Sequence, residues 1–119
     1  MAYQKRYEDS YLDEEEDDFD GAGFSDGARL VLLIKKTNLS QKEEVFLMKL
    51  TDRLTKTAMM PGTVGKEAIE GLVTSAEAYF DVGQKDMAIE TWARLLDIAE
   101  NIGNKDLYYK ATDRMAEIG

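Results

Sequence analysis

The side chains that could perform chemistry in this 119-residue chain are carboxylates, amines, hydroxyls and phenols, because the sequence contains no cysteine and no histidine. Their absence removes disulfides, thiolate nucleophiles, the usual zinc ligands and the usual general base. A catalytic site would have to be built from Asp, Glu, Lys, Tyr or Ser alone. We therefore expect a non-catalytic protein with no cofactor and no metal site.

Two short stretches resemble ligand-binding loops but lack the spacing that binding requires. In PGTVGKEA, Gly62 and Gly65 are too close for a phosphate loop, and Glu67 stands where Ser or Thr would bind the metal. We interpret this stretch as the N-terminus of a helix. In EDDFDG, two aspartates precede a glycine as in a calcium loop, but the twelfth position is Gly27 rather than a bidentate Glu.

Residues 1–26 are acidic and show neither a helical nor a strand period. Residues 1–24 contain nine acidic and two basic residues, which gives a net charge of −7 (2 − 9). Dense like charge resists compaction, so we expect a disordered acidic tail. Two roles remain open for it: a solubilising tail, or a segment that docks on a basic surface of another protein or of this chain. The candidate partner-binding residues of the tail are Asp13, Glu14, Glu15, Glu16, Asp17, Asp18, Phe19 and Asp20.

Residues 28–57 are oppositely charged, with seven basic and three acidic residues and a net charge of +4 (7 − 3). Six of the bases are candidates for one basic surface: Lys35, Lys36, Lys42, Lys49, Arg53 and Lys56. Phosphate contacts need little more than such a surface. However, we do not expect direct nucleic-acid binding, because no DNA-binding motif is present and the chain carries a net charge of −9. We interpret the segment as a solvated helix face.

The tail and this basic segment are separated by glycines, which predict a flexible joint at Gly21, Gly23 and Gly27. A short flexible linker gives an effective concentration in the millimolar range, so weak attraction is enough to populate a folded-back state. We therefore expect the tail to contact the basic segment transiently, in a manner that salt abolishes.

Residues 27–119 are predicted to form a single all-α domain, a small bundle of about five helices. The Leu-rich residues 29–36 predict a short buried helix, because no partner strand is evident elsewhere. Ser40 and Glu43 form a capping box that begins a second helix. This helix is expected to end before Pro61.

The C-terminal half is predicted to contain three more helices. The third runs from about residue 64–66 to 82 and ends at Gly83 in the left-handed conformation. The fourth begins near Asp86, and the fifth runs from about Lys105 onward. Apolar residues of the fourth helix recur at steps of three and four, so Trp92 is predicted to lie in the core.

The apolar runs are too short to cross a bilayer, since the longest covers residues 30–34. The N-terminus is polar and soon becomes acidic, unlike a signal peptide. We therefore expect a soluble intracellular protein, cytoplasmic by default, that does not associate with membranes.

The third and fourth helices share a residue spacing with a known helical repeat. The positions that carry it are Leu72, Ala76, Tyr79, Gly83, Ala88 and Trp92. This spacing resembles the tetratricopeptide repeat, in which small residues let two helices approach and aromatic residues fill the gaps between them. Leu95 replaces a usually small residue and the closing proline is missing, as in the longer-helix variant of the repeat. The resemblance covers about residues 66–119, one repeat and half of another.

The resemblance implies a protein–protein interaction module, acting as an adaptor or regulatory subunit. Its partner-binding face would be the exposed side of the first helix of the hairpin, through Glu77, Phe80, Asp81 and Gln84. One and a half repeats are fewer than the roughly three that a stacked array needs. The missing surface could come from the two N-terminal helices, a larger complex or a homo-oligomer.

A second class of function remains open on the same sequence. The acidic segment, residues 13–20, could imitate nucleic acid and block a basic site. The protein would then be an acidic decoy or regulator of a nucleic-acid-handling enzyme, encoded by a virus or a mobile element. Binding through charge should weaken steeply with salt, whereas binding through apolar contacts should not.

Overall fold

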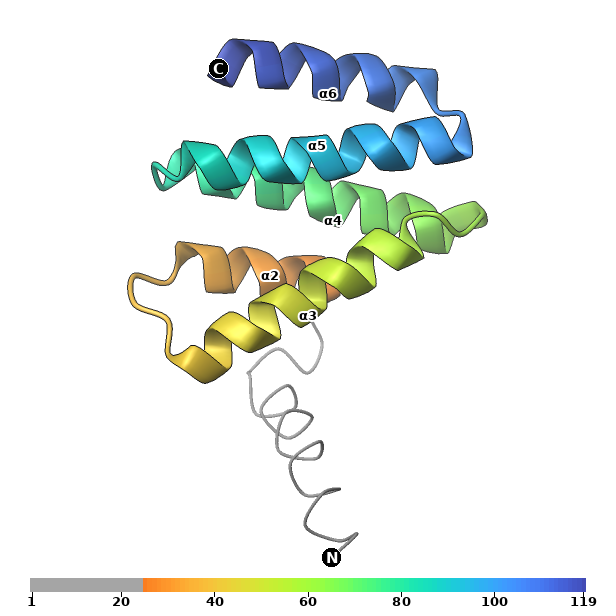
Figure 1. Ribbon diagram of the computed structural model, residues 1–119. Helices are drawn as coiled ribbons and strands as arrows, with labels where there is room; N and C mark the ends of the chain where they lie inside the picture. Colours follow the sequence, from red (N-terminus) through yellow and green to blue (C-terminus); the bar gives the residue numbers. More distant parts are fainter. Residues whose placement is uncertain (1–24) are drawn as a thin grey trace, which may run out of the picture.

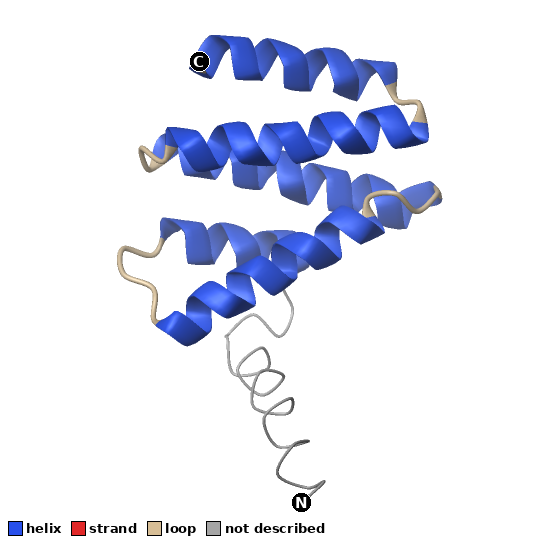
Figure 2. Ribbon diagram, in the orientation of Figure 1, coloured by secondary structure: helices blue, strands red, loops and turns tan. Residues whose placement is uncertain are grey.

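Five helices follow one another along residues 25–119, the part of the chain that the computed structural model describes (Figure 1). They are α2 (Asp26–Lys35), α3 (Gln41–Thr57), α4 (Gly62–Asp81), α5 (Lys85–Ile102) and α6 (Lys105–Ile118). No strand occurs among these residues (Figure 2). The predicted all-α bundle is confirmed, whereas the prediction of a disordered tail concerns residues outside the described part of the chain.

Helix α2 begins three residues before the predicted position, because Ser25 caps it. The Ser25 hydroxyl accepts a hydrogen bond from the backbone N–H of Ala28 at 3.2 Å, and so satisfies one of the free donors at the helix start. The buried apolar side chains of α2 are Leu30, Leu33 and Ile34. This helix is therefore the short buried helix that the sequence predicts.

The capping box predicted for α3 is present. The Ser40 hydroxyl accepts a hydrogen bond from the Glu43 backbone N–H at 3.1 Å, and the Glu43 carboxylate accepts one from the Ser40 backbone N–H at 2.9 Å. Each side chain thus satisfies a backbone donor of the other residue. The core-facing side of α3 consists of Phe46, Leu50 and Leu54.

The assignment of Gly27 to a flexible joint is wrong. Gly27 lies inside α2, is buried, and faces Gly71 of α4. A Cβ atom on Gly27 would lie 2.8 Å from the Cα atom of Gly71, closer than real Cβ contacts come. Glycine is required here because two helix backbones touch, and not because the chain must bend freely.

Glycines also explain the turn that resembles a phosphate loop. Gly62 has a φ of +78°, which other residues rarely adopt. At Gly65 a Cβ atom would lie 1.9 Å from the carbonyl oxygen of Met60. Both glycines therefore serve the tight turn into α4, in agreement with the interpretation of this stretch as a helix start.

Helix α4 is the centre of the bundle, since it packs against α2, α3 and α5. Helix α6 packs against α5 on the side remote from α2 and α3 (Figure 1). Trp92 of α5 is 1% exposed, so its predicted place in the core is confirmed. The turns after α4 and α5 use Gly83 and Gly103, with φ values of +86° and +74°. None of the five described helices has the length and apolar character needed to cross a membrane.

Candidate functional site

A hollow of about 350 Å³ lies between the C-terminal halves of α4 and α6. It is lined by Glu77, Phe80 and Asp81 of α4, Trp92 of α5, and Arg114, Glu117 and Ile118 of α6. Phe80 is 47% exposed although it is a large apolar side chain, whereas Trp92 is buried. The hollow thus offers an apolar surface framed by charged groups.

The charges around this hollow are mostly negative. The Arg114 guanidinium lies 3.9 Å from a carboxylate oxygen of Glu77 and 3.4 Å from one of Glu117. Asp81 has no ion-pair partner within residues 25–119. The lining therefore contains three carboxylates and one guanidinium, and as a whole it favours a positively charged group.

Three of the four residues predicted for the helical face meet in this hollow. Glu77, Phe80 and Asp81 line it, and all three are exposed. Gln84 is also exposed but lies beyond α4, as the residue that precedes α5. Its backbone N–H donates to the carbonyl oxygen of Tyr79 at 2.8 Å, so it belongs to the turn rather than to the hollow.

Carboxylates continue along the exposed side of α4 beyond the hollow. Glu67, Glu70, Glu77 and Asp81 follow one another at steps of three, seven and four residues, which places them on one side of the helix. All four are exposed, as is Thr74 between them. We call this row the α4 acidic stripe.

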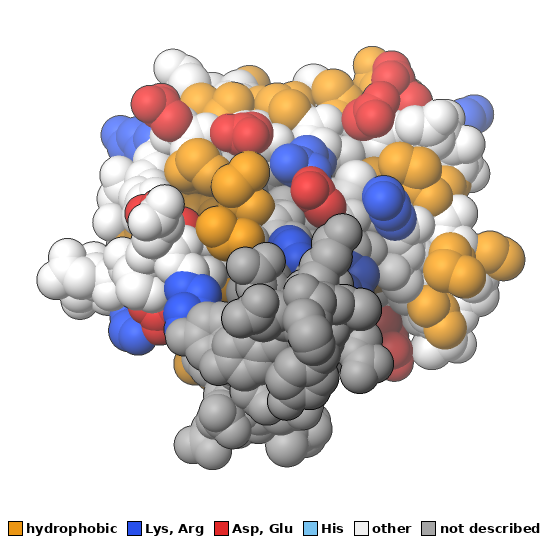
Figure 3. All heavy atoms as spheres, turned by 60° about the horizontal axis from the view of Figure 1, so that its bottom comes forward, with side chains coloured by type: hydrophobic (Ala, Val, Ile, Leu, Met, Phe, Trp, Pro, Cys, Tyr) orange, Lys and Arg blue, Asp and Glu red, His pale blue; other side chains and the backbone are white. Residues whose placement is uncertain are grey.

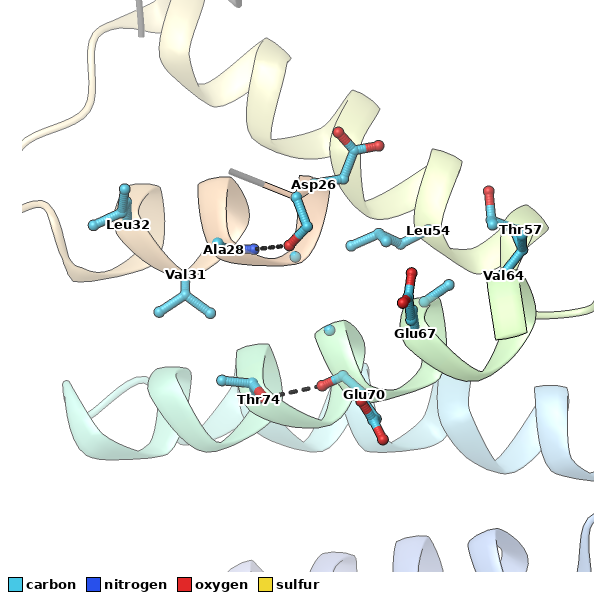
Figure 4. A pocket seen from close by; sticks show the side chains of 14 residues that line it. Asp26, Ala28, Val31, Leu32, Leu54, Thr57, Val64, Glu67, Glu70 and Thr74 are labelled. Atoms are coloured by element: carbon cyan, nitrogen blue, oxygen red, sulfur yellow. Dashed lines mark hydrogen bonds between the residues drawn. The ribbon is translucent and has the colours of Figure 1, made fainter. Parts of the chain in front are cut away.

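The N-terminal half of the α4 acidic stripe borders a second and larger hollow, of about 760 Å³ (Figure 4). Its apolar wall comes from three helices and includes Val31 and Leu32 of α2, Leu54 of α3 and Val64 of α4. Its carboxylates are Asp26, Glu67 and Glu70. Apolar surface and negative charge therefore lie side by side at both ends of the stripe.

Among the carboxylates of the larger hollow, Asp26 has ion-pair partners, whereas Glu67 and Glu70 do not have them within the described residues. Asp26 accepts hydrogen bonds from Arg29 at 3.5 Å and from Arg53 of α3 at 3.2 Å. Neither Glu67 nor Glu70 has an ion-pair partner within the described residues. The unneutralised charge of this hollow thus belongs to the α4 acidic stripe.

The six predicted basic residues fall into two groups. Lys35 ends α2, and Lys36 follows it and forms an ion pair with Glu43. The other four, Lys42, Lys49, Arg53 and Lys56, lie on α3 at steps of seven, four and three residues, and so on one side of that helix. The structure therefore brings four of the six together in one row, which we call the α3 basic stripe.

Two titratable groups in the helices have a shifted pKa. The ion pair with Lys36 and the hydrogen bond from the Ser40 backbone N–H lower the pKa of Glu43 below its usual value. Burial raises the pKa of Tyr79, and the nearby Glu90 raises it further while Arg94 opposes them. Both shifts arise from contacts that belong to the fold: the capping box and ion pair of Glu43, and the burial of Tyr79 in the core.

No group of three or more potential metal ligands occurs within residues 25–119. The predicted tail site, residues 13–20, lies outside the described residues. Comparison with family models, curated proteins and solved structures found no match for the chain. The resemblance to a tetratricopeptide repeat therefore stays a prediction from residue spacing, although its six positions have the packing roles expected of them: five are buried and Gly83 is left-handed.

The α6 side of the small hollow and half of the α4 acidic stripe, Glu67 and Glu70, were not predicted from the sequence. Arg114, Glu117 and Ile118 could not be found from spacing, because the approach of α6 to α4 depends on how both helices pack against α5. The acidic stripe did leave a signal, since Glu67 and Glu70 recur with the same period as the predicted Glu77 and Asp81. The pattern runs along the exposed side of α4 over most of its length.

Proposed function

We propose that the chain is a non-catalytic protein-binding module, an adaptor or regulatory subunit, that recognises a basic segment of a partner through α4. The α4 acidic stripe carries this proposal. Its carboxylates are exposed, and Glu67, Glu70 and Asp81 have no ion-pair partner within the described residues. A Lys- or Arg-rich partner would neutralise these carboxylates, and the attraction between opposite charges would raise its association rate.

Two like-charge spacings within the stripe oppose the stability of the isolated chain, although Glu77 forms an ion pair with Arg114. Like charges three or four residues apart on a helix cost about 0.2–0.5 kcal/mol per pair, and both Glu67 with Glu70 and Glu77 with Asp81 have that spacing. An arrangement that opposes folding in one place is a common mark of a binding surface. The two flanking hollows would receive apolar side chains of the same partner segment, as in other modes of helix or peptide recognition.

Selection of peptides from a random displayed library on the full-length protein tests this function. We expect enrichment of sequences that combine Lys or Arg with an apolar residue. The double variant Glu70→Lys, Asp81→Lys should lower the affinity for the selected peptides by about tenfold or more, because it replaces attraction by repulsion at two positions.

A matched control separates this surface from general charge effects. The double variant Asp97→Lys, Glu100→Lys makes the same charge change at exposed positions of α5 that line neither hollow. It should bind the selected peptides as the parent does. Equal losses in both variants would overturn the assignment to α4, and turnover of a small-molecule substrate by the purified protein would overturn the non-catalytic function.

A further inference from the structure

The α3 basic stripe lies next to exposed apolar side chains. Val45 follows Lys42 by three residues and precedes Lys49 by four, so it shares their side of the helix. Val45 is 43% exposed, and Met48 beside it is 64% exposed. The face of the molecule that carries α2 and α3 displays basic, apolar and acidic side chains (Figure 3).

The acidic residues of α3 do not neutralise this stripe. Asp52 pairs with Arg94 of α5 at 3.3 Å, and Glu43 pairs with Lys36 at the end of α2. Lys49 and Lys56 have no acidic partner within residues 25–119. Positive charge without a described acidic partner therefore remains on α3 at Lys49 and Lys56.

We propose that the α3 basic stripe is the docking surface for residues 13–20 of the same chain. That segment combines seven carboxylates with Phe19, and so complements a face that combines bases with Val45 and Met48. The α4 acidic stripe and the larger hollow beside it repel such a segment, because both carry carboxylates. Charge complementarity thus selects one surface among those that the structure presents.

The point where the described chain begins makes this docking feasible. Asp26 at the start of α2 accepts a hydrogen bond from Arg53 at 3.2 Å, so the described part of the chain begins beside the α3 basic stripe. The six residues from Asp20 to Asp26 span up to about 20 Å when extended. Lys42 lies eleven residues before Arg53, or about 16 Å along the helix axis, so residues 13–20 can cover this distance.

The contact would be intramolecular and sensitive to salt. Individual pairs between exposed charges are weak. Several pairs on one short tether gain from an effective concentration in the millimolar range. At about 1 M salt the Debye length falls to about 3 Å, which removes most of the attraction. The tail would shield the basic stripe from external polyanions, whereas the α4 acidic stripe would stay accessible.

A spin label on the tail tests the proposal in the full-length protein. The chain has no cysteine, so Ser10→Cys provides a single attachment site outside residues 13–20. At low ionic strength, we expect the label to broaden amide signals of residues 42–56 more than those of α6. The broadening should disappear at high salt, and also when every Asp and Glu in residues 13–20 is replaced by Asn or Gln. Equal broadening in the parent and the neutralised tail would overturn the proposal.

Variants of α3 and a mixing experiment complete the test. Lys49→Glu, Lys56→Glu should abolish the broadening, whereas Lys105→Glu, Lys110→Glu, which makes the same charge change on α6, should leave it intact. Loss in both variants would show a general charge effect and overturn the assignment to α3. In a mixture of isotope-labelled protein without the nitroxide and spin-labelled protein without isotopes, broadening at residues 42–56 would assign the tail to a second copy and overturn the intrachain contact.

Discussion

Gly27 of α2 and Gly71 of α4 bring the backbones of two helices into direct contact. A Cβ atom on Gly71 would lie 3.0 Å from the Cα atom of Gly27, and the converse distance is 2.8 Å. Two helices joined at such a crossing can separate only if the core around them is disturbed. The crossing therefore fixes α2 against α4, and with them two walls of the larger hollow.

Replacing Gly71 by alanine should destabilise the protein by about 1–3 kcal/mol, the usual cost of adding volume to a packed core. The sign of the effect is informative, because Gly→Ala inside an unconstrained helix stabilises by about 1 kcal/mol. Thr74→Ala, at an exposed position of the same helix, is the matched control and should stabilise by no more than about 0.7 kcal/mol through helix propensity. Urea denaturation followed by circular dichroism measures both, and a stabilised Gly71→Ala variant would contradict the close crossing.

Trp92→Ala should destabilise the bundle by about 3–5 kcal/mol, because the indole is 1% exposed in the core. Trp92→Phe should cost less, since it leaves a smaller cavity. Because Trp92 is the only tryptophan in the chain, its fluorescence gives an independent measure of burial. Emission typical of a water-exposed indole in the folded protein, together with a mild effect of Trp92→Ala, would place the ring on the surface.

Glu43 should make stability depend on pH in the acid range. Its pKa is lowered in the folded state, so its contribution is present above the unfolded pKa and is lost as the pH falls through the folded pKa. Glu43→Gln should cost no more than about 1 kcal/mol at neutral pH, because its partners are exposed to solvent. The difference from the parent should vanish in acid. Denaturation series across pH, with Glu44→Gln as control, test this; a difference that persists in acid would show that charge is not the cause.

Tyr79 should make the stability of the folded protein depend on pH in the alkaline range. Its folded pKa is raised by burial, so its contribution is complete below the unfolded pKa of about 10 and declines as the pH rises through the folded value. Tyr79→Phe should remove the component that ionises at the highest pH in a titration followed by phenolate absorbance. Tyr109→Phe, at a 61% exposed position, is the control and should leave that component in place. Persistence of the component in Tyr79→Phe would contradict the burial of Tyr79.

Much of the fold could be predicted because its signals are local. The capping box of Ser40 and Glu43 and the left-handed Gly83 and Gly103 act within a few residues, so the sequence specifies them directly. The helical period placed Trp92 in the core for the same reason. Gly27 could not be interpreted correctly from local sequence. A glycine is typical both of a flexible joint and of a close helix crossing, and only the contact with Gly71 in the folded structure distinguishes the two.

The candidate site was predicted on one helix and missed on the other. Glu77, Phe80 and Asp81 were predicted because the resemblance to a helical repeat implies a binding face on the first helix of the hairpin. Arg114 lies far along the chain, and its approach to Glu77 at 3.9 Å depends on the packing of α4 and α6 against α5. Such a relationship is set by tertiary structure, which a periodic pattern does not contain.

Helix α6 packs mainly against α5, and its buried residues are Leu107 and Ala111. Opening this one helix exposes less apolar area than unfolding the bundle, so the amide hydrogens of α6 should exchange with solvent before those of α4. In that opened state one wall of the α4–α6 hollow, including Arg114, is gone. A ligand seated in the hollow would therefore slow the exchange of α6, because local unfolding and binding compete for the same helix.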